Sequence, residues 1–230
     1  MSLYLLINIL VIAVPLAFSF ERKVQFYRKF PAVLGSILIV GTVYVIWDVI
    51  ATRRGDWAFN PDYILGVSLF GLPLEEVMFF ITIPFACLFI YENFRTFMPE
   101  FRLPVSRIVF VTLLVVLVIN AILNLGQHYT ATVLFAWAAF IAAALLVRES
   151  LLYSGVFWSF IVFTLVPFLA VNYVLTSTPV VTYNPEAFSG IRVTTIPLED
   201  FAYSISMLSF HVLIYHLISE KWPGKTPLQS

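Results

Sequence analysis

The chain has 230 residues, of which 61% are hydrophobic and only 11% are charged, and its formal net charge is zero. Soluble domains carry charges on about a quarter of their residues, so this composition predicts an integral membrane protein. The balanced charge gives no support for a nucleic-acid partner, and the single cysteine, Cys87, excludes a disulfide within the chain.

Apolar stretches of about twenty residues, the length that crosses a bilayer as a helix, recur along the sequence. The first one starts at the amino terminus. It lacks the basic region and the cleavage site of a signal peptide, so it is interpreted as a spanning helix. The fold class that follows is all-α, with seven transmembrane helices. They are expected near residues 2–20, 31–51, 73–92, 105–124, 130–147, 151–175 and 197–218.

Basic residues are distributed unevenly between the two ends of these helices. Ten fall on the side of the loop after the first helix and three on the other side. Cytoplasmic loops are enriched in lysine and arginine, so this predicts an outside amino terminus and a cytoplasmic carboxyl terminus. The expected location is the plasma membrane, on the assumption that the source is a prokaryote. The ten are Arg22, Lys23, Arg28, Lys29, Arg95, Arg102, Arg107, Arg148, Lys221 and Lys225, and the three are Arg53, Arg54 and Arg192.

An internal repeat relates each residue to the one 124 positions later. "NPDYILGVSLFGLPLEEVMFFI", from residue 60, aligns without a gap on "NPEAFSGIRVTTIPLEDFAYSI", from residue 184. Three helices plus one linker helix give both units the same orientation, which predicts a 3+1+3 parallel repeat about an axis along the membrane normal. The expected domains are a first three-helix unit (1–103), a linker helix (104–128) and a second three-helix unit (129–230).

Each half carries two adjacent acids at the start of an apolar helix: Glu75 and Glu76, then Glu199 and Asp200. A single acid there is ordinary, because a carboxylate complements the helix dipole. Capping needs no second acid, however, and acids within the membrane normally face a cavity or the interior of the bundle. The repeat predicts that the two pairs face each other across the pseudo-twofold axis at similar depth.

Further candidates lie near the acids. Asp48, whose repeat partner is Asn172, is expected at the depth of Glu75, either in the site or as an interfacial polar residue. Aromatic residues follow each pair, and their faces can stabilise a carbocation, although core packing is the ordinary alternative. The substrate-binding candidates are Asp48, Asn172, Phe79, Phe80 and Tyr203. No histidines stand at ligand spacing on one helical face, so we expect no metal site.

Close pairs of carboxyl groups in an apolar cavity suggest a particular chemistry. One acid of a pair can stay protonated while its neighbour is ionised, which provides a proton donor and a proton acceptor in one dry pocket. Those two groups suffice for proton-initiated cyclisation of a polyene. The acid protonates an alkene, a second double bond attacks the cation, and a base removes a proton. No net redox change occurs, so stoichiometry requires no cofactor, and whether reduced flavin takes part stays open.

The motif "PLEE" at Pro73–Glu76, repeated as "PLED" at Pro197–Asp200, resembles the P-x-E-(E/D) signature of the lycopene cyclase domain family. The chain looks like the fused form of the two-subunit enzymes. The resemblance implies a carotenoid cyclase of the intramolecular lyase or isomerase type, which converts the ψ ends of lycopene, most often to β-ionone rings. It assigns catalysis to the four acids, with the first acid of each pair as the best donor candidate. The implied partners are lycopene, the bilayer and other carotenoid enzymes.

Two other functions are considered for seven apolar helices. Small 3+1+3 transporters carry Pro-Gln dipeptides, which this chain lacks, and their polar groups lie at mid-membrane depth. Retinal proteins need a lysine in the last helix, whereas the lysines here lie in predicted loops or the tail. A transporter, or a cyclase of a different terpenoid, remains the alternative to a lycopene cyclase.

Overall fold

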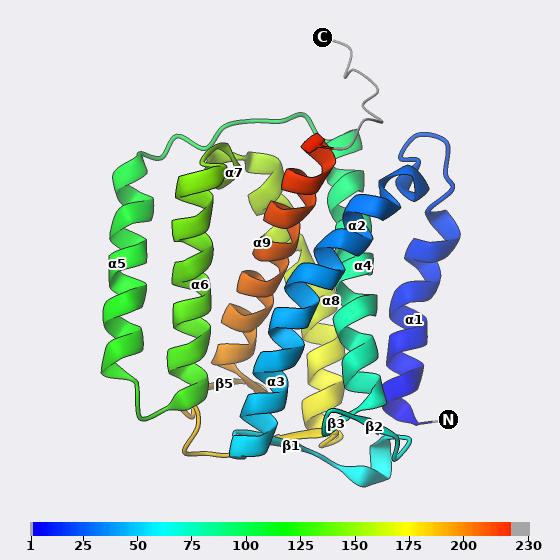
Figure 1. Cartoon of the computed structure of the whole chain (residues 1–230), viewed down its shortest axis with the longest axis vertical. Coiled ribbons are helices and arrows are strands. Elements are labelled where there is room, and N and C mark those ends of the chain that lie inside the picture. The colour runs from blue at the N-terminus through cyan, green and yellow to red at the C-terminus, as the bar shows by residue number, and fades with distance from the viewer. Residues whose placement is uncertain (1, 222–230) are drawn as a thin grey trace.

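The computed structural model of the chain describes residues 2–221 and is mostly helical (Figure 1). Lys225, one of the predicted cytoplasmic basic residues, lies outside this range, and only the backbone of Lys221 is described. The α-helices are α1 (Leu3–Phe18), α2 (Phe30–Ser36), α3 (Thr42–Arg54), α4 (Leu74–Phe97), α5 (Arg107–Leu123), α6 (His128–Val147), α7 (Ser150–Tyr153), α8 (Gly155–Ser177) and α9 (Leu198–Lys221).

The predicted apolar stretches are helical in the structure, with ends that differ by a few residues, except that Ser154 interrupts the stretch predicted at 151–175 and divides it into α7 and α8. A 3₁₀ turn, η1 (Phe26–Lys29), leads into α2, and a π-helical turn, η2 (Ile37–Gly41), joins α2 to α3. Within residues 2–221, the resulting continuous segment is one of five that are long and apolar enough to cross a membrane, with α4, α6, α8 and α9. The apolar helices α1 and α5 are shorter. Such helices fit a membrane protein.

Short strands cover one end of the bundle, which the all-α prediction did not include. They are β1 (Trp57–Phe59), β2 (Ser68–Leu69), β3 (Leu72–Pro73), β4 (Val181–Tyr183), β5 (Arg192–Val193) and β6 (Ile196–Pro197). They form three antiparallel pairs, β1–β4, β2–β3 and β5–β6. The prolines of the two motifs, Pro73 and Pro197, end β3 and β6, one residue before α4 and α9 begin.

The β1–β4 pair joins the two halves of the chain. Trp57 pairs with Tyr183, Ala58 with Thr182, and Phe59 with Val181. Ala58 and Thr182 are also equivalent positions of the repeat, since 124 residues separate them. An antiparallel pair has a local twofold axis, and here that axis passes through its central residue pair.

The loops before α4 and α9 have matching backbone conformations. Gly66 and Gly190 both have φ near +79°, a region that glycine enters without a steric penalty. The N–H of Leu74 donates to the carbonyl of Val67 at 2.8 Å, and at the equivalent place Leu198 donates to Ile191 at 3.0 Å. Repeated glycines in the sequence therefore mark the same turn in both halves.

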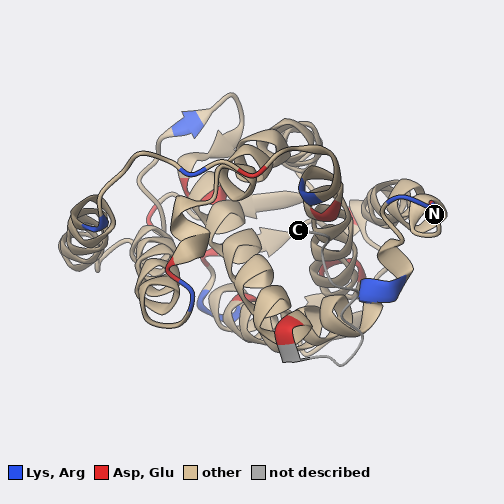
Figure 2. Cartoon of the chain, turned by 90° about the horizontal axis from the view of Figure 1, so that it is seen from above, with Lys and Arg blue, Asp and Glu red and all other residues tan. Residues whose placement is uncertain are grey.

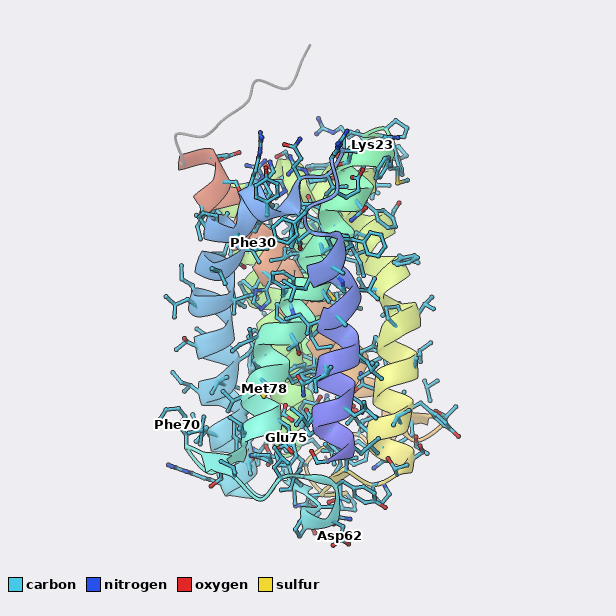
Figure 3. All side chains as sticks on the ribbon, turned by 90° about the vertical axis from the view of Figure 1, so that its right-hand side faces the viewer. Lys23, Phe30, Asp62, Phe70, Glu75 and Met78 are labelled. Atoms are coloured by element: carbon cyan, nitrogen blue, oxygen red, sulfur yellow. The ribbon has the colours of Figure 1, made fainter. Side chains whose placement is uncertain are left out.

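The helices pack in a pattern that leaves α1 and α5 at opposite sides of the bundle (Figures 1 and 2). Helix α1 packs on α4, α6 on α9 and on the peripheral α5, and α2 on α9. Lys23 lies at the end of the bundle opposite Asp62 and Glu75 (Figure 3). Both acidic pairs begin helices at the strand-covered end.

Candidate active site

A cavity of about 340 Å³ runs between α1, α4, α8 and α9, and the β1–β4 pair closes one end of it. Three acidic residues, Asp48, Glu76 and Asp200, line this closed end. The remaining lining is almost entirely apolar. Along α4 it extends from Glu76 to Ile90, and these fourteen helical steps of about 1.5 Å span about 21 Å. The cavity is therefore a long apolar chamber with acids at one end.

In the first half, Asp48 and Glu76 form a pair of acids. Asp48 is 3% exposed and accepts hydrogen bonds from Trp57 Nε1 at 2.7 Å and from the Thr52 hydroxyl at 3.3 Å. The phenol of Tyr4 donates to Glu76. The Oδ2 oxygen of Asp48 is buried and has no hydrogen-bond partner within the described residues. The two acids thus lie together at the closed end of the cavity.

In the second half, Asp200 has two phenol donors. The Tyr129 hydroxyl donates to one carboxylate oxygen at 2.6 Å, and the Tyr183 hydroxyl donates to the other at 2.8 Å. Burial, and then the charge of Asp200, raise the pKa of the Tyr183 phenol well above its ordinary value, so it stays a donor. Two phenols therefore hold both carboxylate oxygens of Asp200 in place.

The first acid of each sequence motif, Glu75 or Glu199, does not line the cavity. Glu75 Oε1 accepts from the Ser2 hydroxyl and from the backbone N–H of Leu65, both at 2.6 Å. Glu199 Oε1 accepts in the same way from Thr130 at 2.6 Å and from the N–H of Ser189 at 2.8 Å. Figure 3 shows Glu75 at the start of α4. These two acids each connect the start of a neighbouring helix to the loop of their own half.

Four of the five predicted substrate-binding residues line the cavity: Asp48, Asn172, Phe79 and Tyr203. Phe80 does not, and its side chain is buried in the main hydrophobic core instead. Asn172, the repeat partner of Asp48, donates to the carbonyl of Phe168 at 3.1 Å.

Sequence reasoning missed the aromatic donors to the acids, which are Tyr4, Trp57, Tyr129 and Tyr183. Aromatic residues near helix ends are normally assigned to the membrane interface, so these four gave no separate signal. Tyr4 and Tyr129 occupy equivalent places beside Glu76 and Asp200 but lie 125 residues apart, so an alignment with a constant shift of 124 does not pair them. An alignment of the first helices with a one-residue gap would have found them.

Comparison with known families gives a match over most of the chain. The model described as "Lycopene cyclase" matches residues 1–94 and 126–218. The chain belongs to the lycopene cyclase family. The predicted resemblance is thereby confirmed. The two matched stretches have nearly equal lengths and cover both halves, with all of α5 left between them.

Two curated fungal relatives also match, and both are named "Bifunctional lycopene cyclase/phytoene synthase". The protein of Podospora anserina is 30% identical over 67 residues, which is 29% of this chain and 10% of that protein. The protein of Arthroderma gypseum is 37% identical over 71 residues, which is 28% of this chain and 12% of that protein. The match thus spans about a tenth of each relative. No solved structure matches the chain.

Proposed function

We propose that this chain is a membrane-embedded lycopene cyclase that converts the ψ ends of lycopene to β-ionone rings by acid–base chemistry, without net redox change. One observation carries the proposal: a long apolar chamber ends at three buried acids. An extended apolar chamber suits a linear hydrocarbon, and acids at its end suit a reaction at the end of that hydrocarbon. Family membership supports the same substrate.

The hydrogen bonds favour a division of roles between the halves. Asp48 and Glu76 are both buried at the acid end of the chamber, where two neighbouring acids can hold one proton between them, and this pair serves as the general acid. It protonates an alkene carbon of the ψ end, and a neighbouring double bond attacks the resulting cation to close the ring. Asp200, held by two phenols, then takes a proton from a ring carbon to form the ring alkene. One proton enters and one leaves, so the reaction is an isomerisation.

This assignment differs from the one that the motif suggests. The motif points to the first acid of each pair, Glu75 and Glu199, as the best donor. Both accept hydrogen bonds behind the cavity wall, and neither lines the chamber. We therefore propose Glu76 and Asp200 as the reacting acids, and Glu75 and Glu199 as residues that position them.

Aromatic faces and the exclusion of water protect the cation in this proposal. Phe79, Tyr203 and Tyr129 line the chamber next to the acids, and an aromatic face attracts a positive charge. A dry chamber keeps water from capturing the cation. The stoichiometry of the cyclisation requires no cofactor. Whether reduced flavin takes part is a question for the expression experiment described below.

We also propose that all seven apolar helices span the bilayer as a 3+1+3 repeat, with units 1–103 and 129–230 and a linker over 104–128. The matching loops, and the strand pair centred on Ala58 and Thr182, support it. The basic residues favour an outside amino terminus and a cytoplasmic carboxyl terminus, in a prokaryotic plasma membrane. The names of the fungal relatives combine a lycopene cyclase with a phytoene synthase, which supports contact with other carotenoid enzymes.

Expression in a bacterial host that accumulates lycopene tests the proposal. Chromatography of the extracted pigments is expected to show β-ring products for the natural chain. Glu76→Gln and Asp200→Asn should each lower ring formation by about 100-fold or more, because Gln and Asn keep the side-chain shape but cannot exchange the proton. Immunoblots of the membrane fraction serve as the control for folding. Unchanged lycopene, with the natural protein present in the membrane, would overturn the proposal.

A further inference from the structure

The chamber has an opening on the side of the bundle. Val14 of α1 lines the cavity and is nevertheless 60% exposed, and Pro167 of α8 also lines the cavity and is exposed. No other helix contributes an exposed lining residue within the part of the chain that the structure describes. The mouth therefore lies between α1 and α8. Figure 3 views this flank, with α1 in front and α8 (yellow) beside it.

The surroundings of the mouth are apolar. Leu10, Val162 and Val166 are 63%, 64% and 66% exposed, and neither α1 nor α8 contains a charged residue. Val14 lies eleven helical steps from the start of α1, and Pro167 ten steps from the end of α8, which places both about 15 Å from the acid end. That is about half the thickness of a hydrocarbon core, so the mouth faces the middle of the bilayer.

Proline marks both helices at the mouth. Pro15 and Pro167 both line the chamber, and each lies in the interior of its helix, α1 or α8. A proline inside a helix lacks the N–H that would bond to the carbonyl four residues earlier, here those of Val11 and Phe163, and the helix is weakened there. Both α1 and α8 can therefore bend locally beside the opening.

The equivalent region in the second half is filled. Phe140 corresponds to Pro15 in the alignment of the first helices that pairs Tyr4 with Tyr129. Its side chain is fully buried, and its ring centroid lies 5.7 Å from that of Phe210. His211, which corresponds to Cys87 of the chamber wall, shares a hydrogen bond of 3.0 Å with the Ser36 hydroxyl. The same hydroxyl donates to the His211 carbonyl at 2.9 Å, so hydrogen bonds fasten α2 to α9 in the region where, in the first half, the chamber lies between α8 and α4.

We propose that the chamber is loaded sideways from the bilayer, through the opening between α1 and α8, by one end of an extended polyene at a time. The identity of the occupant rests on the proposed function, whereas the opening rests on the exposure of Val14 and Pro167. One end must leave before the other can enter, so a two-ring product requires release of a one-ring intermediate. The chain end travels about 15 Å along the chamber before it reaches the acids.

The single cysteine provides a readout that does not depend on catalysis. Cys87 lines the chamber and is 8% exposed. In the full-length protein in lipid vesicles, N-ethylmaleimide, which enters lipid, should alkylate Cys87, while a sulfonate-bearing methanethiosulfonate, which stays in water, should react at least tenfold more slowly. Intact-mass spectrometry measures both rates, and Cys87→Ala is the unlabelled control. Equal rates for the two reagents, or no labelling at all beside a denatured sample that labels fully, would overturn the proposal.

A bulky residue at the mouth completes the test. Val14→Trp should slow both the alkylation of Cys87 and ring formation by tenfold or more. Leu16→Trp is the matched control, because Leu16 is 46% exposed on the same helix but does not line the chamber, and its rates should stay within twofold of the natural protein. If Val14→Trp and Leu16→Trp behave alike, the opening is elsewhere and the proposal fails. If Val14→Trp slows alkylation but even the natural protein forms no rings, the position of the opening is supported and lycopene is rejected as the occupant.

Discussion

The two acids of each motif have different surroundings, although the sequence gives them as neighbours. Glu75 Oε1 already accepts two hydrogen bonds behind the cavity wall, whereas Glu76 lines the chamber. Glu75→Gln keeps that acceptor oxygen, so we expect ring formation within about tenfold of the natural chain, far above Glu76→Gln. Pigment ratios in the lycopene-accumulating host measure both. Equal, severe losses in the two variants would return the donor role to the first acid, as the motif alone suggests.

Tyr183 gives the stability of the protein a dependence on alkaline pH. Its pKa is raised in the folded state, mainly by burial, so its contribution is fully present below the unfolded value of about 10 and is lost as pH rises above it. Stability should fall by up to about 1.4 kcal/mol per pH unit for each such phenol. In Tyr183→Phe, unfolding followed in detergent from pH 8 to 11 should show a shallower decline above pH 10. Parallel declines would mean that Tyr183 is not protonated and buried as described.

Among single residues, the sequence predicted the candidate acids but not the side chains that donate hydrogen bonds to them. Glu76, Asp200 and Asp48 were recognisable because carboxyl groups are rare and costly in apolar helices. Tyr129 and Tyr183 were not, since a tyrosine near a helix end looks the same whether it faces lipid headgroups or a carboxylate. The different roles of Glu75 and Glu76 depend on which way each points at a helix start, which adjacent residues in a sequence do not reveal.

Among the helices, α2 and α9 are joined by a polar contact, the Ser36–His211 clamp, whose contribution to stability can be tested. Ser36 and His211 are both fully buried and hydrogen-bonded to each other. Ser36→Ala leaves the ring nitrogen of His211 without that partner, which should cost about 1–3 kcal/mol. We expect a lower midpoint of thermal unfolding in detergent, with ring formation preserved at permissive temperature. Gly126→Ala, in an open turn, is a control that should leave the midpoint nearly unchanged. An unaltered midpoint in Ser36→Ala would show that the clamp contributes nothing.

Helices were predictable here and strands were not, for a physical reason. Twenty apolar residues in succession have one stable form in a bilayer, whereas strands of two or three residues are too short to show an alternating pattern. The β1–β4 pair in addition joins residues more than a hundred positions apart, so no local signal precedes it. The repeat nevertheless predicted that the loops of the two halves would correspond, and Gly66 and Gly190 do adopt the same φ.

For the whole molecule, the proposed site leaves each half incomplete on its own. The proposed acid pair, Asp48 and Glu76, comes from the first half and the proposed base, Asp200, from the second. Residues 1–103 and 104–230, expressed as separate chains, should each leave lycopene unchanged but form rings when co-expressed. Asp200→Asn in the second chain should abolish that recovery, whereas Glu186→Gln, on an exposed loop, should not. Ring formation by either part alone would contradict a site shared between the halves.

Transfer of a proton to carbon is the central claim, and isotope incorporation measures it most directly. Protein in vesicles, equilibrated in D₂O and present in excess over lycopene, should convert it in a single turnover. Mass spectrometry of the pigment is predicted to show one deuterium for each ring formed and none in the lycopene that remains. Rings that form in D₂O without deuterium would contradict a carboxyl group as the source of the initiating proton.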